Sequence, residues 1–256
     1  MRLRYIIGRA AQGKTYRIYH EMKDRLDEGG DEKLLLIVPE QFTLQTERDL
    51  IKKLGLPGIM RIEVLSFTSL GRRVLNETGG ITRTLINEQG KQMVLRRVID
   101  ENAAKLTAYR KALKRDGFVA RLSEFMSQLK QHHISVQEFA QWCDMMPQDS
   151  IIAQKMHDML IIQQGFVKYL EERYIDTDDY VNLFIDQIEK SHFLKNARVW
   201  IDGFPSFSLP TLRIIEKIMG VAIETSISLT MDPANGLRDR DLFAISRYYY
   251  RRIHDL

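Results

Sequence analysis

Eight residues near the start of the chain have the types and spacing of a phosphate-binding loop. Residues 8–15 read GRAAQGKT, which matches the pattern G-x-x-x-x-G-K-S/T and follows an apolar, strand-like run. In such a loop Gly8 and Gly13 allow backbone N–H groups to turn toward a polyphosphate, Lys14 reaches the β- and γ-phosphates, and Thr15 ligates Mg²⁺. The pattern predicts an ATP and Mg²⁺ site, and the alternative is a glycine-rich turn that contains a lysine. The expected ATP-binding residues are Gly8, Arg9, Ala10, Ala11, Gln12, Gly13, Lys14 and Thr15.

A phosphate-loop protein also needs an acidic residue at the end of a second strand, to hold the Mg²⁺ shell. The segment RVWIDGF offers Asp202, at the carboxyl end of a buried strand, where open α/β sheets bind ligands. The alternative is a strand that ends in a solvated aspartate. The next residue is Gly203, not the Glu that usually polarises the attacking water. Because a general base contributes roughly 10²–10⁴-fold in rate, we expect binding with weak or absent hydrolysis, unless Glu40 or Gln41 replaces the missing Glu.

Alternating strands and helices position these residues. The ranges 3–8, 34–38 and 62–65 read as strands, and 14–28, 40–53 and 66–78 read as helices. Strand-like runs return at 198–202 and 225–230, on either side of a helix at 209–219. This alternation predicts an α/β domain with a parallel sheet.

Between about 87 and 191 the sequence has helical patterns and no convincing strand. Five helices are expected there, at 89–102, 118–131, 135–142, 149–174 and 177–190. We therefore expect a phosphate-loop domain formed by 1–85 and 195–256, interrupted by an all-helical insertion at 86–194. Trp142, Trp200 and the Tyr248–Tyr250 run are expected in the core.

Composition limits the partners and the compartment. A formal net charge of +4 and a pI of about 9.0 fit a nucleic-acid partner. A single cysteine, Cys143, excludes an internal disulfide framework and any cysteine-rich metal site, as expected in the cytoplasm. We find no signal-peptide pattern and no apolar run of ~18 residues, so no membrane association is expected.

The other titratable clusters carry weaker signals. His132, His133 and His157 lack cysteine or carboxylate neighbours at ligand spacing, so we expect no metal site there. Glu21-x-Lys23 and Asp31-x-Lys33 resemble half of a nuclease motif, but their expected positions on a helix and in a turn do not favour a nuclease centre. The arginine pairs at 72–73, 96–97 and 251–252 either follow phosphates or form solvated faces.

The order of five segments resembles a known family. GRAAQGKT, LLLIVPEQFT, VLSFTSLGRRVL, VWIDGFPSF and ISLTMDP are similar to motifs I, Ia, Ib, II and III of superfamily-one helicases. In this form they closely resemble the N-terminal end of the AddB subunits of bacterial AddAB (RexAB-like) helicase–nucleases, over essentially the whole chain. The resemblance implies a RecA-like domain 1A interrupted by a helical domain 1B. It also implies a longer subunit, with a second RecA-like domain that carries most of the catalytic arginines and a C-terminal nuclease with a cysteine-bound 4Fe–4S cluster.

The resemblance assigns roles to particular residues. Gln41 and Thr43 fall in motif Ia, next to Pro39 and Glu40, and Ser66, Phe67 and Thr68 fall in motif Ib; both motifs touch single-stranded DNA in the family. Asp202 matches the acid of motif II, but active helicases have Asp-Glu where this chain has Asp202-Gly203. Motif III is reduced to Asp232, without the usual Gln.

The resemblance also implies partners and a process. They are single- and double-stranded DNA and the A subunit (AddA) of a heterodimer, acting in double-strand-break repair by homologous recombination and in Chi recognition. ATP hydrolysis by this region is expected to be weak or absent, and unwinding is assigned to the partner subunit. The alternatives are an active phosphate-loop ATPase and a small-molecule kinase; a kinase would need an arginine-rich lid, and the helical segment has no compact arginine-rich loop.

Overall fold

The chain folds into two compact units. The computed structural model describes residues 2–55, 61–79, 83–110, 112, 115, 117–132, 134–147, 150–171, 173–232 and 242–256. The first unit contains residues 1–80 and 184–256, and the second contains residues 81–183.

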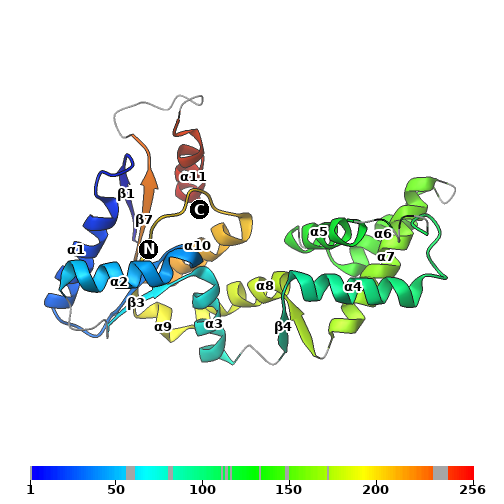
Figure 1. The fold of residues 1–256 in the computed structure, drawn as a ribbon, viewed down its shortest axis with the longest axis horizontal. Coiled ribbons are helices and arrows are strands. Elements are labelled where there is room, and N and C mark those ends of the chain that lie inside the picture. The colour runs from blue at the N-terminus through cyan, green and yellow to red at the C-terminus, as the bar shows by residue number, and fades with distance from the viewer. Residues whose placement is uncertain are drawn as a thin grey trace. The chain divides into compact units, whose positions relative to one another are not determined.

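The first unit is an α/β structure built on five parallel strands, as predicted (Figure 1). Its strands are β1 (Leu3–Gly8), β2 (Lys33–Ile37), β3 (Ile62–Leu65), β6 (Ala197–Ile201) and β7 (Glu224–Thr230). Its helices are α1 (Lys14–Asp27), η1 (Glu40–Phe42), α2 (Thr43–Leu54), α3 (Phe67–Thr78), η2 (Ile188–Lys190), α9 (His192–Lys195), α10 (Leu209–Val221) and α11 (Ala244–His254), and α8 (Thr177–Gln187) crosses from the second unit. The strands lie in the order β1-β7-β6-β2-β3, so segments almost 200 residues apart in sequence become neighbours.

Apolar runs fix the centre of this sheet. The run Leu34–Ile37 of β2 is wholly buried and pairs in parallel register with β3 on one side and β6 on the other. Because neighbouring residues of a strand point to opposite faces, continuous burial means that both faces are covered.

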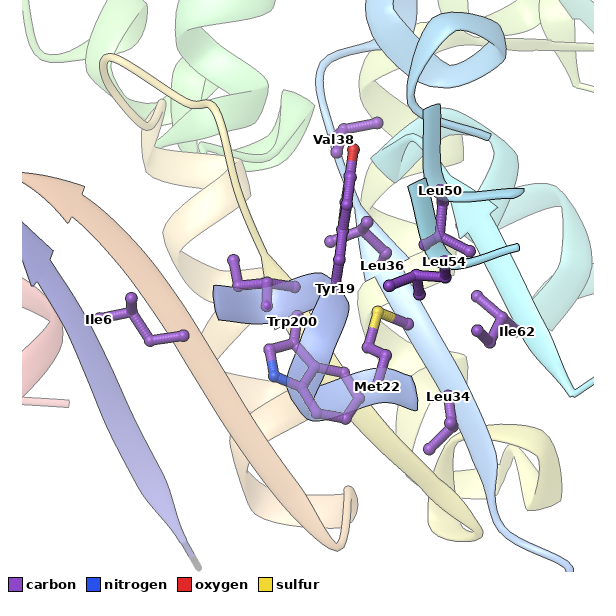
Figure 2. Packing of buried hydrophobic residues seen from close by; sticks show 11 residues of the cluster. Ile6, Tyr19, Met22, Leu34, Leu36, Val38, Leu50, Leu54, Ile62 and Trp200 are labelled. Atoms are coloured by element: carbon purple, nitrogen blue, oxygen red, sulfur yellow. The ribbon is translucent and has the colours of Figure 1, made fainter. Parts of the chain in front are cut away.

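One face of the sheet packs against α1 and α2 (Figure 2). Tyr19 and Met22 of α1 and Leu50 of α2 cover Leu36 and the Trp200 ring. Trp200 is therefore a core residue, as predicted. On the opposite face, Tyr5 of β1 lies with its ring centroid 4.7 Å from that of Tyr250 in α11.

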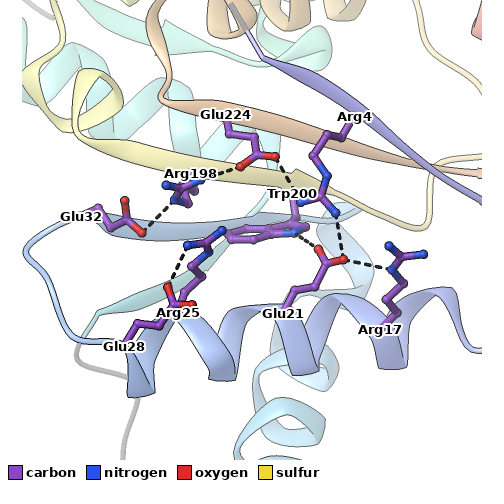
Figure 3. Close-up of polar contacts among 9 residues, drawn as sticks. All are labelled: Arg4, Arg17, Glu21, Arg25, Glu28, Glu32, Arg198, Trp200 and Glu224. Carbon is purple, nitrogen blue, oxygen red and sulfur yellow. Dashed lines mark hydrogen bonds and ion pairs between the residues drawn. The ribbon is translucent and has the colours of Figure 1, made fainter.

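A polar network lies beside this core (Figure 3). Glu21 of α1 accepts hydrogen bonds from Trp200 Nε1 at 3.2 Å, from Arg4 at 2.9 Å and from Arg17 at 3.0 Å. The Arg4 guanidinium also donates to Glu224 of β7 at 3.1 Å. Glu21 thus ties α1 to the sheet, which gives this carboxylate a structural partner set.

The second unit is mainly helical, but it also contains a short parallel sheet. Its elements are β4 (Thr84–Ile86), α4 (Glu88–Asn102), α5 (Phe118–Gln131), α6 (Val136–Asp144), α7 (Ile151–Leu170), β5 (Tyr174–Asp176) and the start of α8. Strand β4 pairs with β5 in parallel. The expectation of no strand between 87 and 191 is therefore wrong at 174–176, and the helix expected to reach Tyr174 ends at Leu170.

A buried charge cluster holds β5 and α8 to α4 and α5. Lys91 is 3% exposed and donates to Asp178 at 2.9 Å and to Ser127 at 2.6 Å. Lys130 donates to both Asp176 and Asp179 at 2.7 Å. These contacts raise the pKa of the Lys130 ammonium even though its burial acts in the opposite direction.

Two expectations about aromatic residues are wrong. Trp142 is 45% exposed, because it lies on the outer face of α6 while Phe139 and Cys143 are buried. Tyr248 is exposed and Tyr249 and Tyr250 are only partly buried, so the Tyr run is not a core segment. In the described ranges no helix is both long enough and apolar enough to cross a membrane.

Candidate functional site

The predicted phosphate loop lies between β1 and α1, at the carboxyl end of the sheet. Gly13 immediately precedes α1 and has φ = 78°, a left-handed conformation that glycine adopts without strain. Ala11 has φ = 61° and is the one non-glycine residue with positive φ in the described part of the chain. This conformation costs an alanine on the order of 1–2 kcal/mol, and such strain is concentrated at functional loops.

Asp202 and Thr15 meet although 187 residues separate them. The Thr15 hydroxyl donates to Asp202 Oδ2 at 2.7 Å, and the Ser228 hydroxyl of β7 donates to Oδ1. The Asp202 backbone N–H donates to the Ile37 carbonyl oxygen at 2.9 Å, which fixes the end of β6 against β2. Asp202 is only 6% exposed, so its carboxylate is held in one orientation toward the start of α1.

Lys14 and Arg9 frame the loop. The Lys14 ammonium donates to the carbonyl oxygens of Gly8 and Arg9, each at 3.0 Å. Arg9 forms an ion pair with the buried Asp232, which follows β7. The Gln12 side chain accepts a hydrogen bond from the Arg9 backbone N–H at 2.8 Å, which closes the turn.

Burial lowers the pKa of the Lys14 ammonium, and the nearby negative charge of Asp202 opposes that shift. The cation therefore lies in a partly desolvated position, where its attraction for an anion is stronger than at an open surface.

The predicted DNA-contacting residues lie on two neighbouring loops at the same edge of the sheet. Gln41 and Thr43 follow β2, while Phe67 and Thr68 follow β3. The Thr68 hydroxyl donates to Glu40 Oε2 at 3.2 Å and joins the two loops. Gln41 and Thr68 are exposed, and Thr43 and Phe67 are partly exposed.

Ser66 has a different environment. It is 3% exposed, and its hydroxyl accepts the Ser69 backbone N–H at 3.1 Å as the N-cap of α3. Ser66 thus fixes the direction of the loop that carries Phe67 and Thr68.

Similarity to known proteins decides the family. Residues 5–256 match the family model described as "ADDB, N-terminal". This chain belongs to that family. It is 45% identical, over its full length, to the B subunit of the ATP-dependent helicase/deoxyribonuclease of Alkaliphilus oremlandii (strain OhILAs), and 44% identical over 99% of its length to the protein of the same name from Alkaliphilus metalliredigens (strain QYMF). A third relative with this name, from Acetivibrio thermocellus, is 36% identical over 99% of the chain. The chain spans 22% of the length of each of these relatives.

The structure adds partners that the sequence did not reveal. Ser228 lies on a strand whose residues look like core, and only the β6–β7 pairing brings its hydroxyl to Asp202. The Arg9–Asp232 pair joins residues 223 positions apart. An aromatic row starts at Phe67 and continues through Phe204 at 5.3 Å and Phe207 at a further 5.6 Å. Only the aromatic spacing of FPSF in the sequence hinted at that row.

The residues present fit a magnesium nucleotide. A hydroxyl and a carboxylate oxygen 2.7 Å apart match the oxygen ligands that Mg²⁺ takes alongside phosphate. In the described residues no group of three or more His, Cys, Asp or Glu side chains could hold a metal by itself, and a phosphate-loop site does not need one, since phosphate and water complete the shell. Pro233, the last residue of the motif III segment, and His133 lie outside the described residues.

Proposed function

We propose that these residues form the nucleotide- and single-stranded-DNA-binding, helicase-like region of an AddB-type subunit, with a RecA-like domain 1A interrupted by a helical domain 1B. The contact that carries the nucleotide proposal is the 2.7 Å hydrogen bond from Thr15 to Asp202. It joins a phosphate loop to a buried acid at the carboxyl end of the sheet, as Mg²⁺-dependent nucleotide binding requires.

When bound, ATP and Mg²⁺ would supply a polyphosphate and a Lewis acid at this site. Lys14 and the backbone N–H groups of the loop would bind the phosphates, and Thr15 and Asp202 would hold the metal and its water. Gly203 offers no carboxylate beside Asp202, so we expect this region to bind ATP but to hydrolyse it slowly. Glu40 is occupied by the Thr68 hydroxyl and is exposed, which does not favour it as the missing base.

Single-stranded DNA would cross the carboxyl ends of the strands, over Gln41, Thr43, Phe67 and Thr68, with Ser66 holding the loop. Loops at this edge of an open parallel sheet are the usual ligand-contacting segments. The aromatic side chain of Phe67 suits base stacking, and the polar side chains suit contacts with sugar and phosphate. The family name and the subunit designation of the relatives support a partner A subunit and a role in double-strand-break processing and Chi recognition.

Titration with ATP and Mg²⁺ by calorimetry tests the nucleotide proposal. Lys14→Ala should weaken binding by about 100-fold or more, because charge-assisted hydrogen bonds contribute roughly 1.5–3 kcal/mol each. Lys23→Ala removes the same charge from a position farther along α1 and should leave the affinity unchanged. Equal affinities of wild type and Lys14→Ala would refute the assignment.

Photocrosslinking tests the DNA path. A photoreactive single strand should crosslink to peptides that contain Gln41–Thr43 and Ser66–Thr68, and binding should weaken with salt because phosphate contacts dominate it. Crosslinks confined to the second unit would show that this path is wrong.

A further inference from the structure

The second unit contains a cavity that plays no part in the function proposed above. It has a volume of about 590 Å³ and lies between the segment before α5, the first turn of α5 and the middle of α7. Its principal lining side chains are Tyr109, Arg115, Phe118, Arg121, Lys155 and Met159. This volume is within the range of roughly 300–1,000 Å³ typical of small-ligand pockets.

The aromatic wall of this cavity is held in place from below. Asp158 of α7 is fully buried and accepts backbone N–H groups from Thr107, at 2.9 and 3.0 Å, and from Tyr109, at 2.9 Å. These bonds fix the backbone of Tyr109, whose ring lies 5.2 Å from that of Phe118. Two partly exposed rings are therefore presented at a fixed position, so little side-chain freedom is lost when a planar ligand binds.

Three cations surround the rings. Arg115, Arg121 and Lys155 are exposed, and in the described part of the chain none of them forms an ion pair. The described lining contains no carboxylate.

The charge of this unit is concentrated around the cavity. Residues 105–121 contain six cations (Lys105, Arg110, Lys111, Lys114, Arg115 and Arg121) and one acid, Asp116, whereas the rest of residues 81–183 contains eight cations and thirteen acids. The positive field is therefore local, and an anionic ligand would be drawn to this end of the unit.

From this combination we infer a second contact for single-stranded nucleic acid, in which one nucleotide unit occupies the cavity. The base stacks on Phe118 and Tyr109, and the flanking phosphates lie against Arg121, Lys155 and Arg115. Stacking of a base on an aromatic side chain contributes roughly 1–3 kcal/mol and requires a base that is not already stacked inside a duplex, which favours a single strand. This contact depends on neither the nucleotide loop nor the path over the first unit.

The test is anisotropy of a labelled homothymidine strand with the full 256-residue chain. The variant Arg121→Glu/Lys155→Glu should weaken binding by about tenfold or more and reduce the slope of log affinity against log salt by about 1.4, because a single strand contributes ~0.7 per phosphate contact. Lys168→Glu is the matched control: it reverses an exposed cation on the same helix as Lys155 but outside the cavity, and it should leave both quantities unchanged. Phe118→Leu keeps an apolar contact with the helices but removes the ring, and it should weaken binding without changing the salt slope.

Three results would overturn this inference. They are no binding by the wild-type chain at low salt, equal effects of the cavity variant and Lys168→Glu, and a duplex that binds as tightly as the single strand and depends equally on the cavity. Calorimetry with ATP separates this test from the proposed function, because the cavity variant should bind ATP as the wild type does.

Discussion

The residue after Asp202 allows a sharp test of whether a missing carboxylate alone limits this site. Gly203 has φ = 81°, in the left-handed region, and a Cβ there would lie 3.5 Å from Pro39 Cδ, an ordinary contact. Space is therefore available and the backbone conformation is the obstacle. Any L side chain at this position should cost on the order of 1–2 kcal/mol of folding free energy.

Two variants separate this strain from the chemistry. Gly203→Ala introduces the strain alone, whereas Gly203→Glu introduces the same strain together with a carboxylate beside Asp202. Both should lower the free energy of unfolding by about 1–2 kcal/mol in urea titrations. A general base is worth roughly 10²–10⁴-fold when correctly placed, but arginine fingers add about 10³–10⁵-fold in related enzymes. The resemblance to superfamily-one helicases assigns most of those arginines to a second RecA-like domain, so we expect Gly203→Glu to hydrolyse ATP less than about tenfold faster than Gly203→Ala.

Multiple-turnover phosphate release with saturating ATP and Mg²⁺ measures the difference. A rate for Gly203→Glu above roughly 1 s⁻¹, at the low end of ordinary enzyme turnover, would refute the reasoning, since one carboxylate would then suffice. If both variants unfolded at the wild-type urea concentration, the argument from backbone strain would be wrong.

Two further predictions concern the polar networks of the two units. Lys91→Met should destabilise the chain by about 3–5 kcal/mol in urea unfolding, because it leaves buried carboxylates without their cation, while Lys105→Met on the surface should change stability by less than ~0.5 kcal/mol; a loss below about 1 kcal/mol for Lys91→Met would contradict this. Burial would raise the pKa of Glu21, but hydrogen bonds from Trp200, Arg17 and Arg4 outweigh it and hold the pKa below the ordinary value of 4.5. Glu21 therefore stabilises the fold above that pH and loses this contribution as pH falls through its lowered pKa, so unfolding of Glu21→Gln should depend less on pH in this acidic window than that of wild type, and identical profiles would refute the assignment.

Sequence patterns were most informative where one local rule decides the structure. The phosphate-loop spacing located the turn before α1, and the run LLLIV identified β2, since continuous burial leaves a strand no polar face. The predicted capping box at Ser135 is present, with Glu138 accepting the Ser135 backbone N–H. Each of these features depends on residues within a few positions of one another.

The features that the sequence could not predict depend on distant residues. Strands β4 and β5 have three residues each, too few for a periodicity, and they exist because they pair with each other. Trp142 reads as a core anchor by residue type, yet its position on the outer face of α6 exposes it. The contacts of Asp202 with Thr15 and Ser228 follow from the strand order, which composition and spacing do not determine.

The central claim is that this region binds ATP without rapid hydrolysis. Its most direct test measures ATP binding by calorimetry and phosphate release on the same preparation, with Mg²⁺, in the presence and absence of a single strand. Saturable ATP binding together with phosphate release well below roughly 1 s⁻¹ under both conditions is the predicted result. The absence of ATP binding would contradict the nucleotide site itself, and release above that rate would show that a group other than a carboxylate at position 203 activates water.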